Sequence, residues 1–411
     1  MRTTISRHKQ AGAVIITTAL VLLFLLGFMA FALDFGKLFV VKSELQTAMD
    51  SCALAAAAEL DTNAGARARA RNAGALAGNN NRVVFQSPTW SGQGNINQNL
   101  DISFRNAAYL EATSDADARY AICQHTQPAV QMWLMRSMAA FSGDTATYPA
   151  QQNVWALAVA SRASSQTTCP VPVGLRPKPG STGPNWGFAP GEWVRVLMQQ
   201  GAVPGGEIGW MNLDGSSSAA ETEREMNGYC NVRVGQQLGT PGVQSSIADA
   251  WNSRFGIYKN NSGPDQLNRT PDFTGYSYTQ TNWPTRQNAY ADFVQKRAAF
   301  AACAPSGRVR GGNSCESITG LSLNSFQNLA TAGPGGQHQL YGSNRRVVPV
   351  PVVNGSTLVD YACMLMLQPM TIPMSNIYME FLGNAAQPNS PCTTSGIPGG
   401  SAGPQVPVLV R

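Results

Sequence analysis

The chain has 411 residues and a net charge of +6, from 29 Lys and Arg against 23 Asp and Glu. The positive charge is spread along the chain apart from Arg67, Arg69 and Arg71, with no basic stripe among aromatic residues, which argues against nucleic-acid binding. Charged residues make up only 13%, whereas Gly (40) and Pro (25) are plentiful, a composition typical of a loop-rich exported protein rather than a cytosolic enzyme.

The first predicted element is an apolar segment without a charge, Ala13–Leu33, which follows a basic leader at residues 1–12. A helix of this length spans about 30 Å, the thickness of the hydrocarbon core of a bilayer. Because the leader carries the positive charges, the positive-inside rule places it in the cytoplasm and residues 34–411 on the other side. We therefore expect a single-pass membrane protein anchored by Ala13–Leu33.

Two alternatives to a permanent anchor are open. Ala30-Phe31-Ala32 resembles a signal-peptidase site, so the chain could be an exported hydrolase released after Ala32. Against this, the apolar segment is longer than the usual core of a signal peptide, and no helix-breaking region precedes the site. Gly12 after the basic leader resembles a prepilin processing site, but Thr17 stands where prepilins carry Glu. We favour the uncleaved anchor.

The helical pattern continues beyond the apolar segment, and we expect residues 34–77 to form an amphipathic stalk helix. The stretch SCALAAAAEL strongly favours helix, and no breaker follows Asp34, which is expected to be a solvated boundary of the membrane. Apolar residues alternate spacings of three and four along one face. This face is predicted to pack on the protein's own soluble domain or on a helix of another subunit, and we call it the seam: Leu38, Val41, Leu45, Ala48 and Cys52, continued by Ala55.

Residues 10–60 combine the basic leader followed by Gly-Ala, the long apolar span, Asp34-x-Gly36 and the stretch ELQTAMDSCALAAA. In these features they resemble the N-terminal segment of TadE/TadG-like Flp pilus-assembly proteins. Looser similarity continues through the soluble part, for example in RRVVPVPVV at residues 345–353. The resemblance implies a non-enzymatic component of tight-adherence (Flp/Tad) pilus assembly in the bacterial inner membrane. Its bulk would lie in the periplasm, where it would bind and position other pilus or secretion subunits.

The remaining chain is predicted to consist of a linker at residues 78–98 and a mixed α/β or α+β periplasmic domain at residues 99–411, with one or two lobes. Early strands are expected at NRVVF, NLDISF and VWALAVASRAS. Helices are expected at AVQMWLMRSMAAF, GEWVRVLMQ, AETEREMNGYC, SSIADAWNSRFGIY and NAYADFVQKRAAFAAC. Buried strands of one final sheet are expected at RRVVPVPVV, CMLMLQPM, IYMEFLG and VPVLV.

The cysteines indicate disulfides rather than a metal site. None of them forms a C-x-x-C motif, and the chain has only three histidines, His8, His125 and His338, which argues against zinc. An even number of cysteines in an exported chain is typical of disulfides. We propose local pairs between Cys303 and Cys315 and between Cys363 and Cys392, while the sequence does not specify the other partners: Cys52, Cys123, Cys169 and Cys230.

One motif suggests metal binding. The run from Asp214 to Ser218, DGSSS, matches D-x-S-x-S, the metal-ion-dependent adhesion site of von Willebrand factor A domains, which some TadG-type proteins carry. In such a site Asp214, Ser216 and Ser218 would hold Mg²⁺ through oxygen atoms. The alternative is a flexible loop that caps the following helix without metal.

The sequence contains no Walker loop and no H-E-x-x-H motif. We therefore assign no catalytic residue and no cofactor. His125 is expected at a helix end beside a disulfide, and His338 is expected to be exposed in a glycine-rich loop. Tyr276, Tyr278 and Trp283 are expected either to form a recognition surface or to anchor their own loop.

Overall fold

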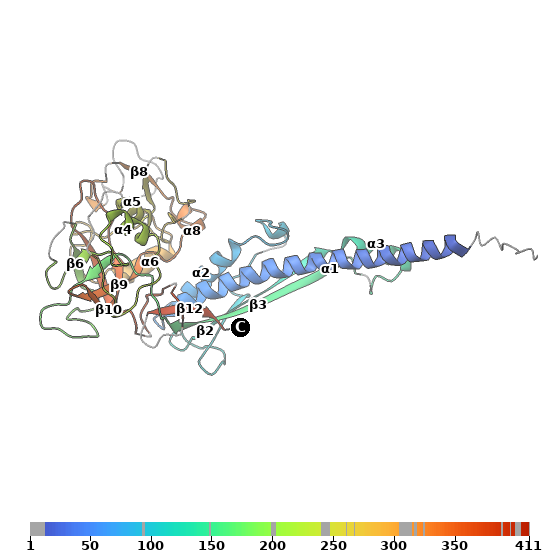
Figure 1. Ribbon diagram of the computed structural model, residues 1–411, viewed down its shortest axis with the longest axis horizontal. Helices are drawn as coiled ribbons and strands as arrows, with labels where there is room; N and C mark the ends of the chain where they lie inside the picture. The colour runs from blue at the N-terminus through green and yellow to red at the C-terminus, as the bar shows by residue number, and fades with distance from the viewer. Residues whose placement is uncertain are drawn as a thin grey trace, which may run out of the picture.

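A long helix projects from a mixed helix and sheet body in the computed structural model (Figure 1). The structure describes residues 13–410 except 93–94, 148, 199–202, 240–246, 260, 267, 304–314, 316–318, 324, 388, 395 and 399–403. The basic leader, with His8 and Gly12, lies outside the described residues. The body has two lobes, a sheet lobe along the helix and a barrel lobe at its C-terminal end, and the mixture confirms the predicted α+β class.

The projecting helix α1 (Ala13–Ala58) has 46 residues, which makes it roughly 70 Å long. It does not continue to residue 77 as the sequence suggested. The chain turns at Thr62 and Gly65, both with positive φ (65° and 81°), and α2 (Ala66–Asn79) packs back on α1. Asp115 begins this second helix by accepting a hydrogen bond from the backbone N–H of Gly65 at 2.7 Å.

Glycines let the two helices approach closely. A Cβ added at Gly74 would lie 3.1 Å from both the Cys52 carbonyl oxygen and the Ala56 Cβ. A Cβ at Gly78 would lie 3.1 Å from the Cys52 Cβ and 2.2 Å from the Ile96 Cδ1. The predicted single stalk helix is therefore a helix hairpin, held together by small residues on both faces.

A four-stranded antiparallel sheet covers another side of α1, with strand order β1-β2-β3-β12. Two expectations change in this lobe. The segment NRVVF contains only an isolated bridge between Val83 and Ser87, followed by the short helix η1 (Trp90–Gly92). The predicted helix AVQMWLMRSMAAF is divided between the end of β2 and α3 (Trp133–Ser142), which lies at the tip of the β2–β3 hairpin. The strands are β1 (Ile102–Arg105), β2 (Tyr120–Gln131), β3 (Gln151–Ser164) and β12 (Gln405–Leu409).

The second lobe is built on a closed six-stranded barrel with strand order β10-β11-β5-β6-β4-β9. The segment GEWVRVLMQ, predicted as a helix, forms β5, in which Val194 and Val196 are buried and Arg195 between them is exposed. The final strand β12 was expected in this sheet but pairs with β3 of the other lobe. The barrel strands are β4 (Val173–Leu175), β5 (Trp193–Val196), β6 (Ile208–Trp210), β9 (Val347–Asn354), β10 (Thr357–Met366) and β11 (Ile377–Asn384).

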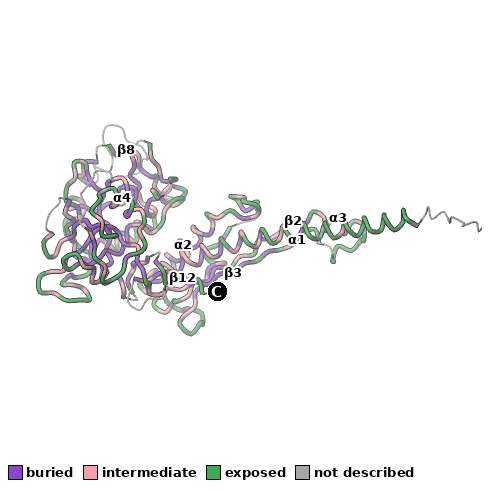
Figure 2. The backbone as a smooth tube through the Cα atoms, viewed as in Figure 1, coloured by how far each residue is buried: buried purple, intermediate pink, exposed green. Residues whose placement is uncertain are grey.

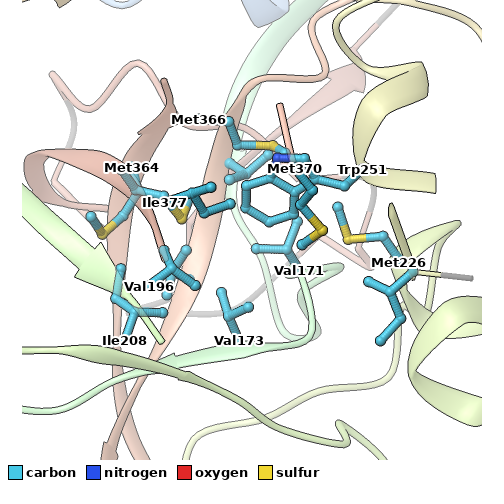
Figure 3. Packing of buried hydrophobic residues seen from close by; sticks show 14 of the residues in the cluster. Val171, Val173, Val196, Ile208, Met226, Trp251, Met364, Met366, Met370 and Ile377 are labelled. Carbon is cyan, nitrogen blue, oxygen red and sulfur yellow. The ribbon is translucent and has the colours of Figure 1, made fainter. Parts of the chain in front are cut away.

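Apolar side chains from these strands form the main core of the barrel lobe. Figure 3 shows Val196, Ile208, Met364 and Ile377 gathered together, with Trp251 packed beside them. Short helices and one small strand pair surround this core: α4 (Ala219–Met226), α5 (Ile247–Ser253), α6 (Tyr290–Ala298), α8 (Gln337–Leu340), β7 (Ile257–Lys259) and β8 (Phe326–Leu329).

Candidate functional site

The N-terminal part of α1 is an apolar surface that the rest of the chain leaves exposed. Its large apolar side chains from Val14 to Leu33 all lie open to the surroundings, for example Leu23 at 69% (Figure 2). Within the described part of the chain, one helix is long and apolar enough to cross a membrane, and it is this one. The segment therefore has the length and composition of a membrane anchor.

Burial begins at Asp34, directly after this apolar surface. The side chain of Asp34 is only 3% exposed, so the expected solvated boundary is wrong. Its carboxylate accepts hydrogen bonds from the backbone N–H groups of Trp133 (3.1 Å), Leu134 (3.0 Å) and Met135 (2.7 Å). These are the first residues of α3, whose N–H groups have no partner within the helix. Asp34 therefore caps α3 from a different element.

The seam packs inside this chain. Val41, Leu45, Ala48 and Cys52 are fully buried in one core with the sheet and α2, and Leu38 packs against that core. Of the two expectations for the seam, the structure therefore shows packing on the protein's own soluble part rather than on a helix of another subunit. An apolar stripe on a helix needs only one covering surface, and the β2–β3 hairpin supplies it.

Polar side chains of α1 add hydrogen bonds to the same sheet. Lys37 Nζ donates to the Gln131 carbonyl oxygen at 2.7 Å, and Gln46 Nε2 donates to the Leu157 carbonyl oxygen at 2.9 Å. Lys42 also donates to a backbone carbonyl of β3. The C-terminal part of α1 is therefore joined to its own sheet by apolar packing and by polar contacts.

Disulfides add covalent ties. The structure pairs Cys52 with Cys123 and so joins α1 to β2. Cysteines 303 and 315 are paired, as are cysteines 363 and 392, which are the two local pairs proposed from the sequence. The fourth pair is Cys169 with Cys230, and no described cysteine is free.

Buried ion pairs join the end of α1 to the barrel lobe. Arg297 on α6 places its Nη2 3.0 Å from Glu59 Oε1, and Arg69 on α2 places its Nε 3.3 Å from Glu59 Oε2. Arg297 also faces Asp272 at 3.6 Å, and Arg69 faces Asp61 at 2.6 Å. Burial alone would raise the pKa of Glu59, but Arg297 and Arg69 bring that pKa below its ordinary value. We call these five residues the junction cluster.

The D-x-S-x-S motif lies in a hydrogen-bonded loop after β6. The Ser216 N–H donates to Asp214 Oδ1 at 2.8 Å, while the Asn212 side-chain amide donates to Ser216 Oγ at 2.9 Å and to the Ser218 carbonyl at 2.8 Å. Glu225 accepts hydrogen bonds from backbone N–H groups of the same loop. Among the described residues, no group of three or more His, Cys, Asp or Glu is arranged to hold a metal. Metal binding by Asp214, Ser216 and Ser218 stays a prediction.

Both described histidines lie elsewhere than expected. His338 is on α8 and fully buried rather than exposed, with Nδ1 2.7 Å from the Asp272 carbonyl oxygen, and burial lowers its pKa. His125 follows the disulfide-bonded Cys123 as expected, but it is on β2 rather than at a helix end, with Nδ1 2.9 Å from Asp101 Oδ2. Both imidazole rings contact an oxygen atom of another segment. The residues that flank each histidine in the sequence gave no indication of these contacts.

The aromatic loop packs on itself. The Tyr276 and Tyr278 rings lie 5.2 Å apart, and the Tyr278 and Trp283 rings lie 5.4 Å apart, both edge to face. Tyr278 is fully buried, and its hydroxyl donates to Asp292 Oδ2 at 2.7 Å. Of the two expectations for this loop, the contacts correspond to a loop anchored by its own aromatic residues.

Comparisons with curated proteins and with solved structures find no match for this chain. A comparison with protein families does find one, and it covers the whole of α1. The matching residues include the exposed apolar surface, Asp34 and the buried seam up to the junction cluster. Residues 12–59 match the family described as putative Flp pilus-assembly TadE/G-like.

Proposed function

We propose that this protein is a non-enzymatic, membrane-anchored component of Flp/Tad pilus assembly that binds and positions other pilus or secretion subunits. Its anchor, Ala13–Leu33, crosses the bacterial inner membrane once with the N-terminus in the cytoplasm. Residues 34–411 lie in the periplasm. The partners are other subunits of the Tad/Flp machinery and the lipid bilayer, with no nucleic acid and no cofactor.

One observation carries the proposal. The helix that matches the pilus-assembly family is exposed and apolar in its first part, and buried in its own sheet lobe in its second part. Because no break separates the two parts, a force or displacement on the anchor is transmitted directly to the soluble lobes. Such a continuous element suits a protein that holds a periplasmic body at a fixed height and orientation above the membrane.

The burial of the seam bears on where partners bind. A partner cannot use Val41, Leu45, Ala48 or Cys52 without displacing the β2–β3 hairpin. Partner contacts are therefore assigned to the exposed anchor within the bilayer and to the outer surfaces of the two lobes. This assignment replaces the expectation that the seam packs on a helix of another subunit.

The first test is the amount of major pilin in the sheared surface fraction of a deletion strain. We expect the deletion to remove surface pilin while cellular pilin is retained, and the full-length chain to restore it. Residues 34–411 exported behind a cleavable signal peptide serve as the matched comparison and should not restore it. Normal surface pilin in the deletion strain would contradict the assembly role, and rescue by the anchorless chain would contradict the need for an anchor.

A further inference from the structure

Aromatic and cationic side chains gather around α1 directly after the anchor. Lys37 Nζ lies 4.1 Å from the centroid of the Trp133 ring and 5.7 Å from that of Phe85. Lys42 Nζ lies 4.6 Å from the centroid of the Trp155 ring. All three rings are mainly exposed, at 71% for Trp133, 52% for Phe85 and 62% for Trp155. The rings come from three separate segments and lie beside Lys37 or Lys42 of α1.

The helix α3 lies at the same end of the sheet lobe. The β2–β3 hairpin carries it away from the barrel lobe until it lies beside the exposed part of α1 (Figure 1). Asp34 fixes the start of α3 through three backbone hydrogen bonds. The position of α3 relative to the anchor is thus set by hydrogen bonds to a buried carboxylate.

The outer face of α3 has the composition of an interfacial helix. Trp133, Arg136 and Ser137 are exposed at positions three and four residues apart, whereas Met132 and Ala139 are buried. Tryptophan and arginine beside a membrane-spanning helix are typical of the polar headgroup region, where an amphipathic ring and a long cationic side chain both find partners.

We propose that the start of α3, held at Asp34, together with the exposed rings of Trp133, Phe85 and Trp155, forms a second membrane contact in the phospholipid headgroup region at the outer end of the anchor. This inference rests on the proposed membrane-spanning role of Ala13–Leu33 and adds a contact to it. A single membrane-spanning helix can rotate about its own axis and tilt relative to the bilayer normal. A second contact at the side of that helix fixes both its rotation and its tilt, and so determines which faces of the periplasmic lobes point toward neighbouring subunits.

The test uses the full-length chain in vesicles of phosphatidylethanolamine and phosphatidylglycerol. Because no described cysteine is free, a single added cysteine gives one site for a fluorophore. Ser137→Cys places the label on the outer face of α3, and Ser217→Cys on the barrel lobe is the matched control, since both serines are exposed. Leu23→Cys places a label inside the anchor. Quenching is then measured with nitroxide lipids that carry the spin label near the headgroup or deep in the acyl chain.

We expect the headgroup nitroxide to quench the label at Ser137→Cys, the deep nitroxide to quench the label at Leu23→Cys, and neither to quench the label at Ser217→Cys. Quenching at Leu23→Cys with none at Ser137→Cys would overturn the α3 contact and leave the anchor in place. Loss of quenching at both Ser137→Cys and Leu23→Cys would overturn both the α3 contact and the membrane anchor. Stronger quenching at Ser137→Cys by the deep nitroxide would contradict a headgroup position.

A second variant tests the tryptophan directly. Trp133→Ala in the Ser137→Cys background should lose headgroup quenching, whereas Trp133→Phe should retain more of it because an aromatic ring remains. Trp133 is largely exposed, so its truncation leaves no buried cavity. Unchanged quenching with Trp133→Ala would contradict a role for this ring in membrane contact.

Discussion

At the scale of single residues, buried carboxylates bind several backbone N–H groups of other segments. Asp34 and the three N–H groups that it binds are about a hundred positions apart, with a separation of 99 for Trp133. Glu225 likewise binds the N–H groups of Leu213 and Asp214 and holds the loop that carries the D-x-S-x-S motif. In both cases one side chain satisfies several backbone donors that would otherwise lack partners.

The first prediction concerns the cap on α3. Asp34→Ala should speed hydrogen exchange at the amides of Trp133, Leu134 and Met135, because a lost N-cap weakens a helix by about 1–2 kcal/mol. Asp34→Asn keeps an acceptor oxygen and should restore most of the protection. Exchange is measured by mass spectrometry on the full-length chain in detergent, with amides of β10 as the internal reference. Equal exchange in all three proteins would show that Asp34 does not cap α3.

The second prediction concerns pH. Burial raises the pKa of Glu225 to about 7, against the ordinary value of 4.5, although the N–H groups of Leu213 and Asp214 lower it in part. Because the folded state binds this proton more tightly, the associated stability is present below pH 4.5 and is lost as the pH rises through about 7. Between pH 5 and pH 8 the melting temperature should therefore fall more for the natural chain than for Glu225→Gln. Parallel melting curves would contradict the raised pKa.

At the scale of secondary structure, much of the chain could be predicted from local patterns. The apolar span, the alternating residues of β3 and the apolar runs of β9, β10 and β11 all gave the right element type. The failures have physical causes. GEWVRVLMQ has a helix-like composition, but its Val194 and Val196 follow a period of two in a barrel strand. The stalk was predicted as one helix because the turn near Gly65 contains no proline.

The candidate site was less predictable than the fold. The seam residues were identified correctly as one face of a helix, yet sequence periodicity alone cannot show whether a covering surface belongs to the same chain. The hydrogen bonds of Asp34 and the junction cluster are contacts between distant segments, so no local pattern signals them. His338 was placed outside for the same reason, since its partner is a backbone carbonyl 66 positions away.

The third prediction tests the helix hairpin. Gly78→Leu should destabilise the sheet lobe by about 1–3 kcal/mol, the usual effect of inserting bulk into a packed interface. Its side chain would meet Cys52 and Ile96, which already lie within contact distance of an added Cβ. Asn72→Leu places the same side chain on the exposed face of α2 and is the matched control. Equal denaturation midpoints for the two variants would contradict close packing of α2 on α1.

At the scale of the whole molecule, two kinds of contact carry the arrangement from the membrane to the barrel lobe. Apolar packing and the Cys52–Cys123 disulfide fix α1 in the sheet lobe. The junction cluster then joins the end of α1 to α6 of the barrel lobe. Pairing between β12 and β3 returns the C-terminal segment from the barrel lobe to the sheet lobe. The lobes are thus linked at several points, which suits a rigid body above an anchor.

The fourth prediction concerns the junction cluster. Glu59→Gln should destabilise the protein by about 2–3 kcal/mol, because removing one member of a buried ion pair leaves its partner less well compensated. The depressed pKa of Glu59 means that its contribution is present at neutral pH and is lost as the pH falls below the ordinary value of 4.5. The pair of Glu221 with Arg224 supplies the control because its Arg224 side chain is 72% exposed, and Glu221→Gln should change stability by less than about 1 kcal/mol. Similar losses in the free energy of unfolding for Glu59→Gln and Glu221→Gln would contradict a stabilising role for the junction cluster.

The account as a whole claims that one uncleaved helix is both the membrane anchor and part of the core of the soluble body. The measurement that tests this most directly is intact-mass and disulfide mapping of the chain purified from membranes without reduction. We expect a chain that retains Ala13–Leu33, with a crosslinked peptide that joins Cys52 to Cys123. A mature chain that begins at Leu33, or a Cys52 linked to a different protein, would contradict the account.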